Sequence, residues 1–289
     1  MLTGIFSALG ASFFWTYACF LWRRQTKQLP PLTINLAKNV IAFIIFFPVL
    51  FTFDYKSNAI NILLLILSGS LGISIGDSLY ITALKKIGTR KTLAVEAFSP
   101  LLATALGSIL LKEILPIRVC FGILIVTISL LGIAFEKNSS NIEEHNTKNQ
   151  NKGLIFAFLS VFFAVMAAII SRKVLLNSSL SPFQTTEIRL FGSIFCLMPF
   201  LKDSFSHSLH NFSFRKNPMI YLSTLLGTNL GIFLQQNAFQ ILPIGLAWTL
   251  LSTSSIMALF FARLEGEILT IKTVIFTIII IIGVAIAFI

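Results

Sequence analysis

The chain has 289 residues, of which 56% are hydrophobic and only 11% are charged. Its mean hydropathy is +0.88, whereas about a quarter of the residues of a soluble domain are charged. This composition excludes an ordinary soluble protein and indicates a polytopic membrane protein. The net charge of +11 does not indicate a nucleic-acid partner, because the basic residues stand in short clusters between apolar segments.

Ten apolar segments are long enough to cross a bilayer, which takes about 20 residues each. In chain order they cover residues 3–22, 32–53, 61–84, 92–111, 116–135, 153–171, 182–201, 218–239, 244–262 and 268–288. The first ends at Arg23-Arg24, which is typical of a retained helix and not of a cleaved signal peptide. The sequence therefore predicts an all-α, multi-pass integral membrane protein with ten transmembrane helices, located in the cell membrane.

The two halves of the chain resemble each other. Pro31, Lys38 and Pro48 recur as Pro182, Arg189 and Pro199 at one constant spacing, and Glu113-Ile114-Leu115 recurs as Glu267-Ile268-Leu269. The polar, Asn-rich stretch 136–152 separates a first repeat, residues 1–135, from a second, residues 153–289. Because each repeat holds an odd number of helices, the second enters the membrane upside down. Such inverted repeats place a binding site near the bilayer midplane.

Small residues at every fourth position also recur in both repeats. Ser68, Gly72 and Gly76 match Ser223, Gly227 and Gly231. On a helix these residues form a ridge without bulky side chains, which lets a second backbone approach closely. We expect both ridges to be helix-packing surfaces.

The same residues carry a resemblance to a known family. The third segment of each half closes with A-L-K-K-I-G or A-F-Q-I-L-P, and the fourth ends with L-L-K-E-I-L or L-E-G-E-I-L. Together with the basic positions Lys38 and Arg189 and the glycines, this layout resembles the drug/metabolite transporter superfamily, in its EamA-type ten-helix branch. The resemblance implies a transporter, not an enzyme, whose third, fourth, eighth and ninth helices line a central cavity. It places the fifth and tenth helices at the periphery, and it makes export of amino acids or related metabolites the first expectation.

Three charged residues of the first half lie inside apolar segments, where charge is costly and therefore indicates function. At 1.5 Å per residue, Lys38, Asp77 and Glu96 each lie roughly 7–11 Å from the same membrane face. One carboxylate can then pair with Lys38, and the other is left to take a proton or to meet a cationic group of the cargo. The alternatives are that Lys38 snorkels to the interface, that both carboxylates only hold helices together, or that Glu96 is a solvated boundary residue.

The second half carries a different polar set. Arg189 is a candidate to bind a cargo carboxylate or phosphate, with snorkelling as the alternative. Asn229, Ser254 and Ser255 supply uncharged hydrogen-bonding groups, of which Asn229 is the deepest. Among the aromatic residues, Trp15, Tyr80 and Trp248 are candidates to form the floor of the cavity. Trp22, beside Arg23, is typical of an anchor at the membrane interface. Pro100 is placed to break the fourth helix near the site.

The sequence offers no metal site and no cofactor. His207 and His210 have an H-x-x-H spacing without a third ligand nearby. All three cysteines lie in apolar segments and are expected to be packing residues. When the Lys and Arg residues are counted in each connection between apolar segments, the positive-inside rule puts both termini outside the cell. The family resemblance puts them inside, so the orientation in the membrane stays open.

These observations lead to one prediction with two alternatives. The prediction is a secondary transporter that moves a small polar or amphipathic metabolite, amino-acid-like cargo and export being favoured, by alternating access. Its predicted partners are the small-molecule substrate and the lipid bilayer, and also protons if Asp77 or Glu96 couples transport. We expect it to be a monomer or a homodimer. The alternatives are an uncoupled exchanger that holds anions or organic phosphates with Lys38 and Arg189, and a non-transporting membrane scaffold or sensor.

Overall fold

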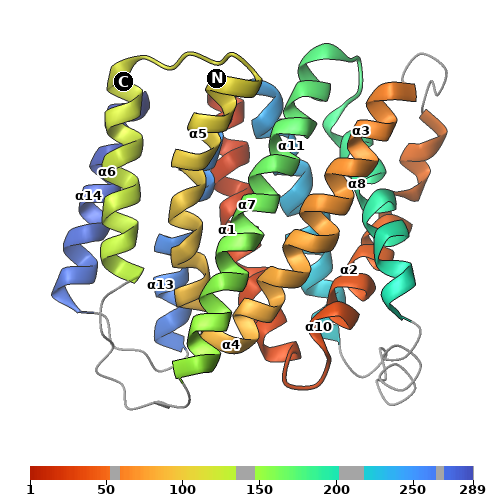
Figure 1. Cartoon of the computed structure of the whole chain (residues 1–289), viewed down its shortest axis with the longest axis horizontal. Helices are drawn as coiled ribbons and strands as arrows, with labels where there is room; N and C mark the ends of the chain where they lie inside the picture. The colour runs from red at the N-terminus through yellow and green to blue at the C-terminus, as the bar shows by residue number, and fades with distance from the viewer. Residues whose placement is uncertain (53–58, 135–146, 202–217, 265–269, 289) are drawn as a thin grey trace.

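The computed structural model describes residues 1–52, 59–134, 147–201, 218–264 and 270–288, and every regular element within these ranges is helical. The longer helices run side by side along one direction (Figure 1). In chain order the α-helices are α1 (Leu2–Gln25), α2 (Pro31–Phe46), α3 (Ala59–Gly69), α4 (Asp77–Val95), α5 (Ser99–Leu110), α6 (Ile117–Ala134), α7 (Thr147–Asn177), α8 (Pro182–Leu197), α10 (Pro218–Ser223), α11 (Gly231–Ile241), α12 (Ile244–Leu251), α13 (Ser254–Leu264) and α14 (Ile271–Phe288). The all-helical class predicted from the sequence is confirmed.

Within the described residues, seven helical stretches are long and apolar enough to cross a membrane, judged by length and composition. They are Leu2–Gln25, Pro31–Thr52, Ala59–Thr89, Lys91–Leu110, Gln150–Asn177, Ile244–Phe261 and Ile271–Phe288. Of the other predicted spans, Ile117–Ile133 is a shorter apolar helix, and α8 has 16 residues with Glu187 and Arg189 among them. Large apolar side chains cover the outside of the molecule, as Phe6, Ile60 and Phe195 show with 71%, 75% and 69% exposure.

Local sequence signals explain where several helices begin and turn. α8 starts with a capping box, in which the Ser181 hydroxyl accepts from the Gln184 amide and the Ser181 amide donates to the Gln184 side chain, at 3.3 and 2.9 Å. Pro182 follows as the first helical residue, where its missing amide hydrogen costs nothing. Within the long stretch of α4, the chain reverses at Gly88, whose φ of 81° favours glycine.

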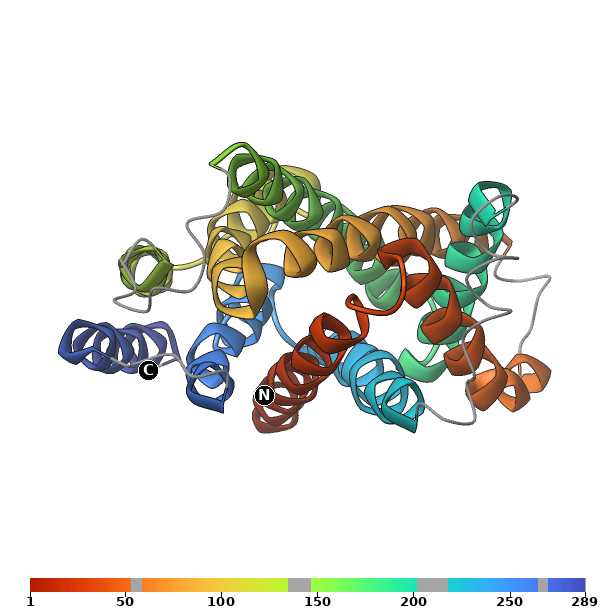
Figure 2. The same cartoon turned by 90° about the horizontal axis from the view of Figure 1, so that it is seen from below.

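Helices α6 and α14 pack against each other at one end of the molecule (Figures 1 and 2). Their backbones cross at two glycines, because a Cβ at Gly122 would lie 2.7 Å from the carbonyl oxygen of Gly283. No larger residue fits either position without separating the helices. This pair stands where the family resemblance expects the fifth and tenth helices.

Two π-helical segments interrupt the bundle at matching places in the two halves. The first, η2 (Ser70–Gly76), joins α3 to α4, and the second, η6 (Thr224–Leu230), joins α10 to α11. A π-helix pairs its amides one residue further back than an α-helix, and such turns are frequent at functional sites. The Asn35 side chain of α2 stabilises η2 by donating to the carbonyl oxygens of Ile73 and Ser74, at 2.9 and 3.0 Å.

Short 3₁₀ segments complete the path of the chain. η1 (Phe47–Thr52) and η4 (Met198–Leu201) extend α2 and α8, and η3 (Glu96–Phe98) lies between α4 and α5. Of the predicted linker 136–152, residues 136–146 lie outside the described residues, and residues 147–152 form the first turns of α7. His207 and His210 also lie outside the described residues.

Candidate functional site

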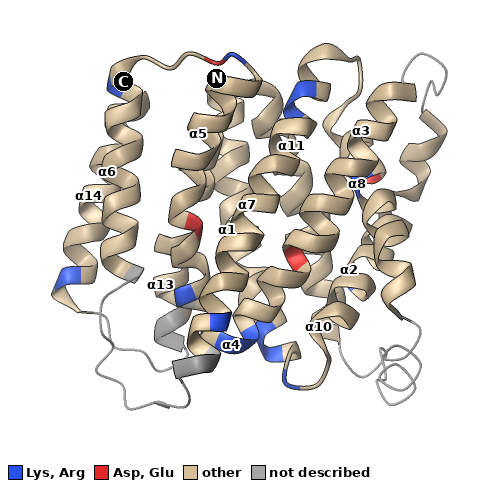
Figure 3. Ribbon diagram, viewed as in Figure 1, with Lys and Arg blue, Asp and Glu red and all other residues tan. Residues whose placement is uncertain are grey.

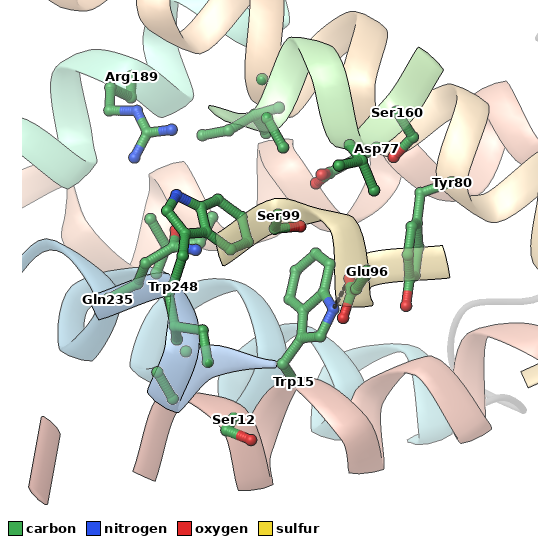
Figure 4. A pocket seen from close by; sticks show the side chains of 18 residues that line it. Ser12, Trp15, Asp77, Tyr80, Glu96, Ser99, Ser160, Arg189, Gln235 and Trp248 are labelled. Carbon is green, nitrogen blue, oxygen red and sulfur yellow. Dashed lines mark hydrogen bonds between the residues drawn. The ribbon is translucent and has the colours of Figure 1, made fainter. Parts of the chain in front are cut away.

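A cavity of about 70 Å³ lies in the middle of the bundle, between the two halves of the chain (Figure 4). Residues of α1, η2, α4, η3 and α5 line it from the first half, and residues of α7, α8, α11 and α12 from the second. The expected third, fourth, eighth and ninth helices all contribute. Helices α1, α7 and α8 line it as well, through residues such as Ser12, Ser160 and Arg189.

Asp77 lies at the cavity wall and forms an ion pair with Lys38. The Lys38 Nζ is 2.7 Å from the Asp77 Oδ2, and the Lys38 side chain has 0% exposure. The ammonium also donates to the Asn39 side chain at 2.9 Å and lies 5.3 Å from the centre of the Trp22 ring. Lys38 therefore does not snorkel. Its charge is compensated inside the protein, as a buried charge requires.

Glu96 stands in η3, where the helix geometry changes just before Pro100. Its carboxylate accepts one hydrogen bond from the Trp15 Nε1 at 3.3 Å and one from the Ser254 hydroxyl at 3.0 Å. Because α1 and α13 supply these donors, Glu96 joins both halves. The ion pairs found among the described residues do not include Glu96, so it faces the cavity without a cationic partner there.

Arg189 brings a second charge to the cavity, from α8. It has 4% exposure, and its Nε and Nη1 make no hydrogen bond to any described residue. Glu187, two residues earlier, is equally buried, and neither of its carboxylate oxygens has a hydrogen-bond partner in the described part of the chain. Glu187 is not part of the cavity lining, whereas Arg189 is.

Aromatic rings form much of the remaining wall. Trp15, Tyr80 and Trp248 all line the cavity, and the Trp15 and Tyr80 rings lie 5.6 Å apart. Trp22 was expected at the membrane interface because it precedes Arg23. It is instead fully buried, and its ring packs against Trp15 at 5.2 Å.

Two of the polar residues that the sequence predicted for the cavity make their hydrogen bonds to backbone groups of other helices. Asn229 has 0% exposure and donates to the Ala42 carbonyl oxygen at 3.0 Å, outside the cavity lining. The Ser255 hydroxyl donates to the Leu93 carbonyl oxygen at 2.7 Å. Both side chains hold helices together. Gln235, six residues after Asn229, lines the cavity.

The small-residue ridges face neighbouring helices of the other half. The Ser68 hydroxyl donates to the Ala167 carbonyl oxygen in α7 at 2.7 Å, and a Cβ at Gly72 would lie 2.7 Å from the Cβ of Ala167. In the second ridge, Ser223 accepts a 3.3 Å hydrogen bond from Gln25 of α1. A Cβ at Gly227 would overlap the Cβ of Ala18, also in α1. At Gly76 and Gly231 the nearest atoms are further away, at 3.4 and 3.3 Å.

Several residues of the site give little signal in the sequence. Ser12 and Ser160, which line the cavity, are small hydroxyl residues in apolar segments. Asn35 does not line the cavity and acts on the lining segment η2 through the backbone carbonyl oxygens of Ile73 and Ser74. The face that each presents depends on how its helix is rotated, which a π-helical segment changes. No group of three or more histidine, cysteine or acidic side chains is placed to hold a metal among the described residues.

A family model described as the EamA-like transporter family matches residues 2–135 and again residues 151–289. A solved structure titled only "Crystal structure of protein" has a TM-score of 0.73 with this chain at 13% identity, and the alignment covers 99% of this chain and 96% of that one. No curated protein matches the sequence.

Proposed function

The chain belongs to the EamA-like transporter family, and from that premise we propose that it is a secondary transporter working by alternating access. Family membership, together with the apolar helices, makes it a multi-pass integral membrane protein that transports small molecules. The family is one of transporters and not of enzymes. We further propose its mechanism, its cargo and its coupling, and we place it in the cell membrane.

The first element of the proposal is a frame of ten spans in two inverted five-helix repeats, residues 1–135 and 153–289. The family model matches the two halves separately, and the contacts between them mirror each other. Gly72 packs on Ala167 of α7, and Gly227 packs on Ala18 of α1. The two π-helical segments also stand at matching places. Repeats related in this way bring a shared site to the middle of the bilayer.

The cavity between the halves is the observation that carries the transport proposal. It joins charged groups, Glu96 and Arg189, to aromatic and aliphatic walls. A site of this kind suits a small molecule with a polar end and an apolar body. Amino-acid-like cargo is therefore favoured. Export is favoured because members of the family that the sequence resembles are often exporters.

Alternating access requires each end of the cavity to open in turn, and one end carries a latch. Glu113, just after α5, forms an ion pair with Arg172 of α7. The same carboxylate accepts from the Ile244 amide at 2.8 Å, and Arg172 also donates to the Phe239 carbonyl oxygen. These contacts clamp the turn between α11 and α12. Opening this end requires the latch to release.

The sequence repeat predicts a second latch at the opposite end. Arg23 occupies the place of Arg172 in the first repeat, and its guanidinium lies against Gly88 in the matching turn, 3.0 Å from where a Cβ would stand. Glu267, which matches Glu113, lies outside the described residues. Two such clamps, released alternately, would give a rocking bundle its two states.

For coupling we favour Glu96 over Asp77. Asp77 is already neutralised by Lys38, whereas Glu96 faces the cavity with hydrogen-bond donors only. A proton and an amino group of the cargo would compete for the Glu96 carboxylate. Such competition exchanges protons for cargo, which drives export when protons flow inward.

The uncoupled anion exchanger remains the second candidate, because Arg189 is free for an anion. The ion pair of Lys38 with Asp77 counts against it, since that model needs both cations. Membership of a transporter family counts against a non-transporting membrane scaffold or sensor.

Transport in liposomes tests the proposal. Purified protein is reconstituted, and efflux of labelled amino acids is measured with and without a pH gradient. We expect efflux that rises with an opposing proton gradient, and a Glu96→Gln variant that exchanges cargo but ignores the gradient. If Glu96→Gln and Asp77→Asn both respond like the parent, the coupling role is wrong. A parent that moves only anions, and only against a counter-substrate, would favour the uncoupled exchanger.

A further inference from the structure

We propose that Arg189 is the carboxylate-binding subsite for a zwitterionic, amino-acid-like cargo whose ammonium group faces Glu96. The inference rests on the transport function proposed above and assigns a separate role to each cavity charge. Figure 4 shows Arg189 and Glu96 on opposite sides of the group of residues that lines the cavity. The two charged ends of a small molecule could thus be bound at separate places.

The guanidinium of Arg189 is buried without a hydrogen-bonded partner among the described residues, and the Asp77 carboxylate acts on it only from a distance. Its Nε and Nη1 make no hydrogen bond to a described residue, and the described residues give it no ion pair. A buried charge without a partner is strongly unfavourable. Since Arg189 lines the cavity, an anionic ligand there would supply the missing partner.

Two further donors at the cavity are unused. The Trp248 Nε1 and the Ser99 hydroxyl are both buried, and neither makes a hydrogen bond to a described residue. Trp248 can only donate through Nε1. Together with Arg189 these groups offer donors that an oxyanion could accept from. A planar carboxylate fits the fork of a guanidinium in a bidentate manner.

The charge balance of the cavity selects a zwitterion. The Asp77 carboxylate is paired with Lys38, so the charged residues of the described lining that have no ion-pair partner are Arg189 and Glu96, one of each sign. A zwitterion satisfies both of these without bringing net charge into the membrane interior. A phosphate dianion would satisfy Arg189 but would face the like charge of Glu96, which costs affinity.

The backbone around Arg189 is fixed closely enough to hold a subsite. A Cβ at Gly69 would overlap the Arg189 carbonyl oxygen, so α3 and α8 touch backbone to backbone. A Cβ at Gly72 would lie 3.4 Å from the Nη2 of Arg189. The absence of side chains at both glycines therefore sets the position of the guanidinium and leaves space beside it.

Tryptophan fluorescence can test this subsite directly, because Trp15 and Trp248 line the cavity. The twenty proteinogenic L-amino acids are titrated into the purified protein in detergent. The tightest binder is then compared with its amide and with its decarboxylated amine. We expect the parent to bind the amino acid about tenfold or more tightly than either analogue, as a lost charged hydrogen bond implies.

The Arg189→Gln variant should remove this discrimination. Its affinity for the amino acid should fall about tenfold or more, and its affinity for the amide should stay within about threefold of the parent value. Arg118→Gln changes the same residue type at an exposed position of α6 and should behave like the parent. A structural role of Arg189 would instead weaken all ligands alike.

Two results would overturn the inference. One is an Arg189→Gln variant that still prefers the amino acid to its amide. The other is a parent that binds none of the amino acids. In that second case, flux of another class of solute in liposomes would leave the transporter proposal standing, whereas absence of any flux would remove both.

Discussion

The Lys38 ammonium and the Asp77 carboxylate meet at 2.7 Å, and Lys38 has no surface exposed. The pair joins α2 to the start of α4, directly after η2. Its consequence is that the first half of the chain contributes one uncompensated charge to the cavity, Glu96, and not three.

Replacing Asp77 with Asn should destabilise the protein strongly. The change leaves the Lys38 ammonium buried without a counter-charge, which costs about 3–5 kcal/mol of the free energy of unfolding. The loss should appear as a lower melting temperature of the purified protein in detergent. A Lys38→Met/Asp77→Leu double variant should recover most of it, because an apolar pair of similar size avoids the buried charge. An Asp77→Asn protein that melts with the parent would contradict the buried pair.

The ridge glycines should differ in their tolerance of a methyl group. Gly72→Ala places a Cβ 2.7 Å from the Cβ of Ala167, and such overpacking costs about 1–3 kcal/mol. Gly76→Ala is the matched control, because its nearest atom would be 3.4 Å away and alanine favours helix over glycine. Melting temperatures should therefore fall for Gly72→Ala and stay level or rise for Gly76→Ala. The opposite order would refute the close contact of η2 with α7.

Neutralising Glu113 should loosen the latch on the turn between α11 and α12. Glu113→Gln removes the charge that pairs with Arg172, so the end of the cavity at this turn should open more often. A single cysteine at Ser99, in a protein whose three native cysteines are replaced, reports on access to the cavity. It should react faster with a membrane-impermeant maleimide applied from the side of this turn.

The control for the latch is Lys173→Gln. Lys173 is exposed on α7, next to Arg172, and makes no contact with Glu113 among the ion pairs of the described residues. Equal labelling rates in Glu113→Gln, Lys173→Gln and the parent would show that the ion pair does not control access.

Asn35→Ala should destabilise the π-helical segment η2. The Asn35 amide donates to the carbonyl oxygens of Ile73 and Ser74, and each lost hydrogen bond costs about 0.5–1.5 kcal/mol. The Ser74 oxygen still accepts from the Ser78 hydroxyl at 2.6 Å, so it is not left unpaired. Chemical denaturation in mixed micelles would measure the loss. Asn177→Ala provides the comparison, since Asn177 is exposed and bonds only within its own helix. Its effect should stay within about 0.5 kcal/mol.

The sequence predicted the helical class well, because it follows from composition, and the rise per residue put the three charged residues of the first half at one level. Lys38 and Asp77 were placed at one level by that argument, and the structure has them in contact. It could not predict rotation about each helix axis. Asn229 was chosen for its depth, yet it points at the Ala42 carbonyl oxygen, whereas Gln235 lines the cavity.

Trp22 shows a second limit of sequence reasoning. Its place beside Arg23 is typical of an interfacial anchor, but the ring is buried against Lys38 and Trp15. Whether an aromatic residue near a helix end faces lipid or protein depends on which neighbour covers it. That neighbour is distant in sequence, so no local pattern reports it.

The π-helical segment η2 also fixes how insertions and deletions can be tolerated in this chain. Each residue of a regular helix turns the path by about 100°. A π-helical turn holds about one residue more than an α-helical turn, so removing a single residue between Ser70 and Gly76 would let α3 run evenly into α4 with the direction of Asp77 nearly unchanged. The same deletion within α3 would turn Asp77 by about 100°, away from Lys38. A homologue one residue shorter in the π-helical stretch could therefore keep its acidic side chain at the aligned column and retain the same partner.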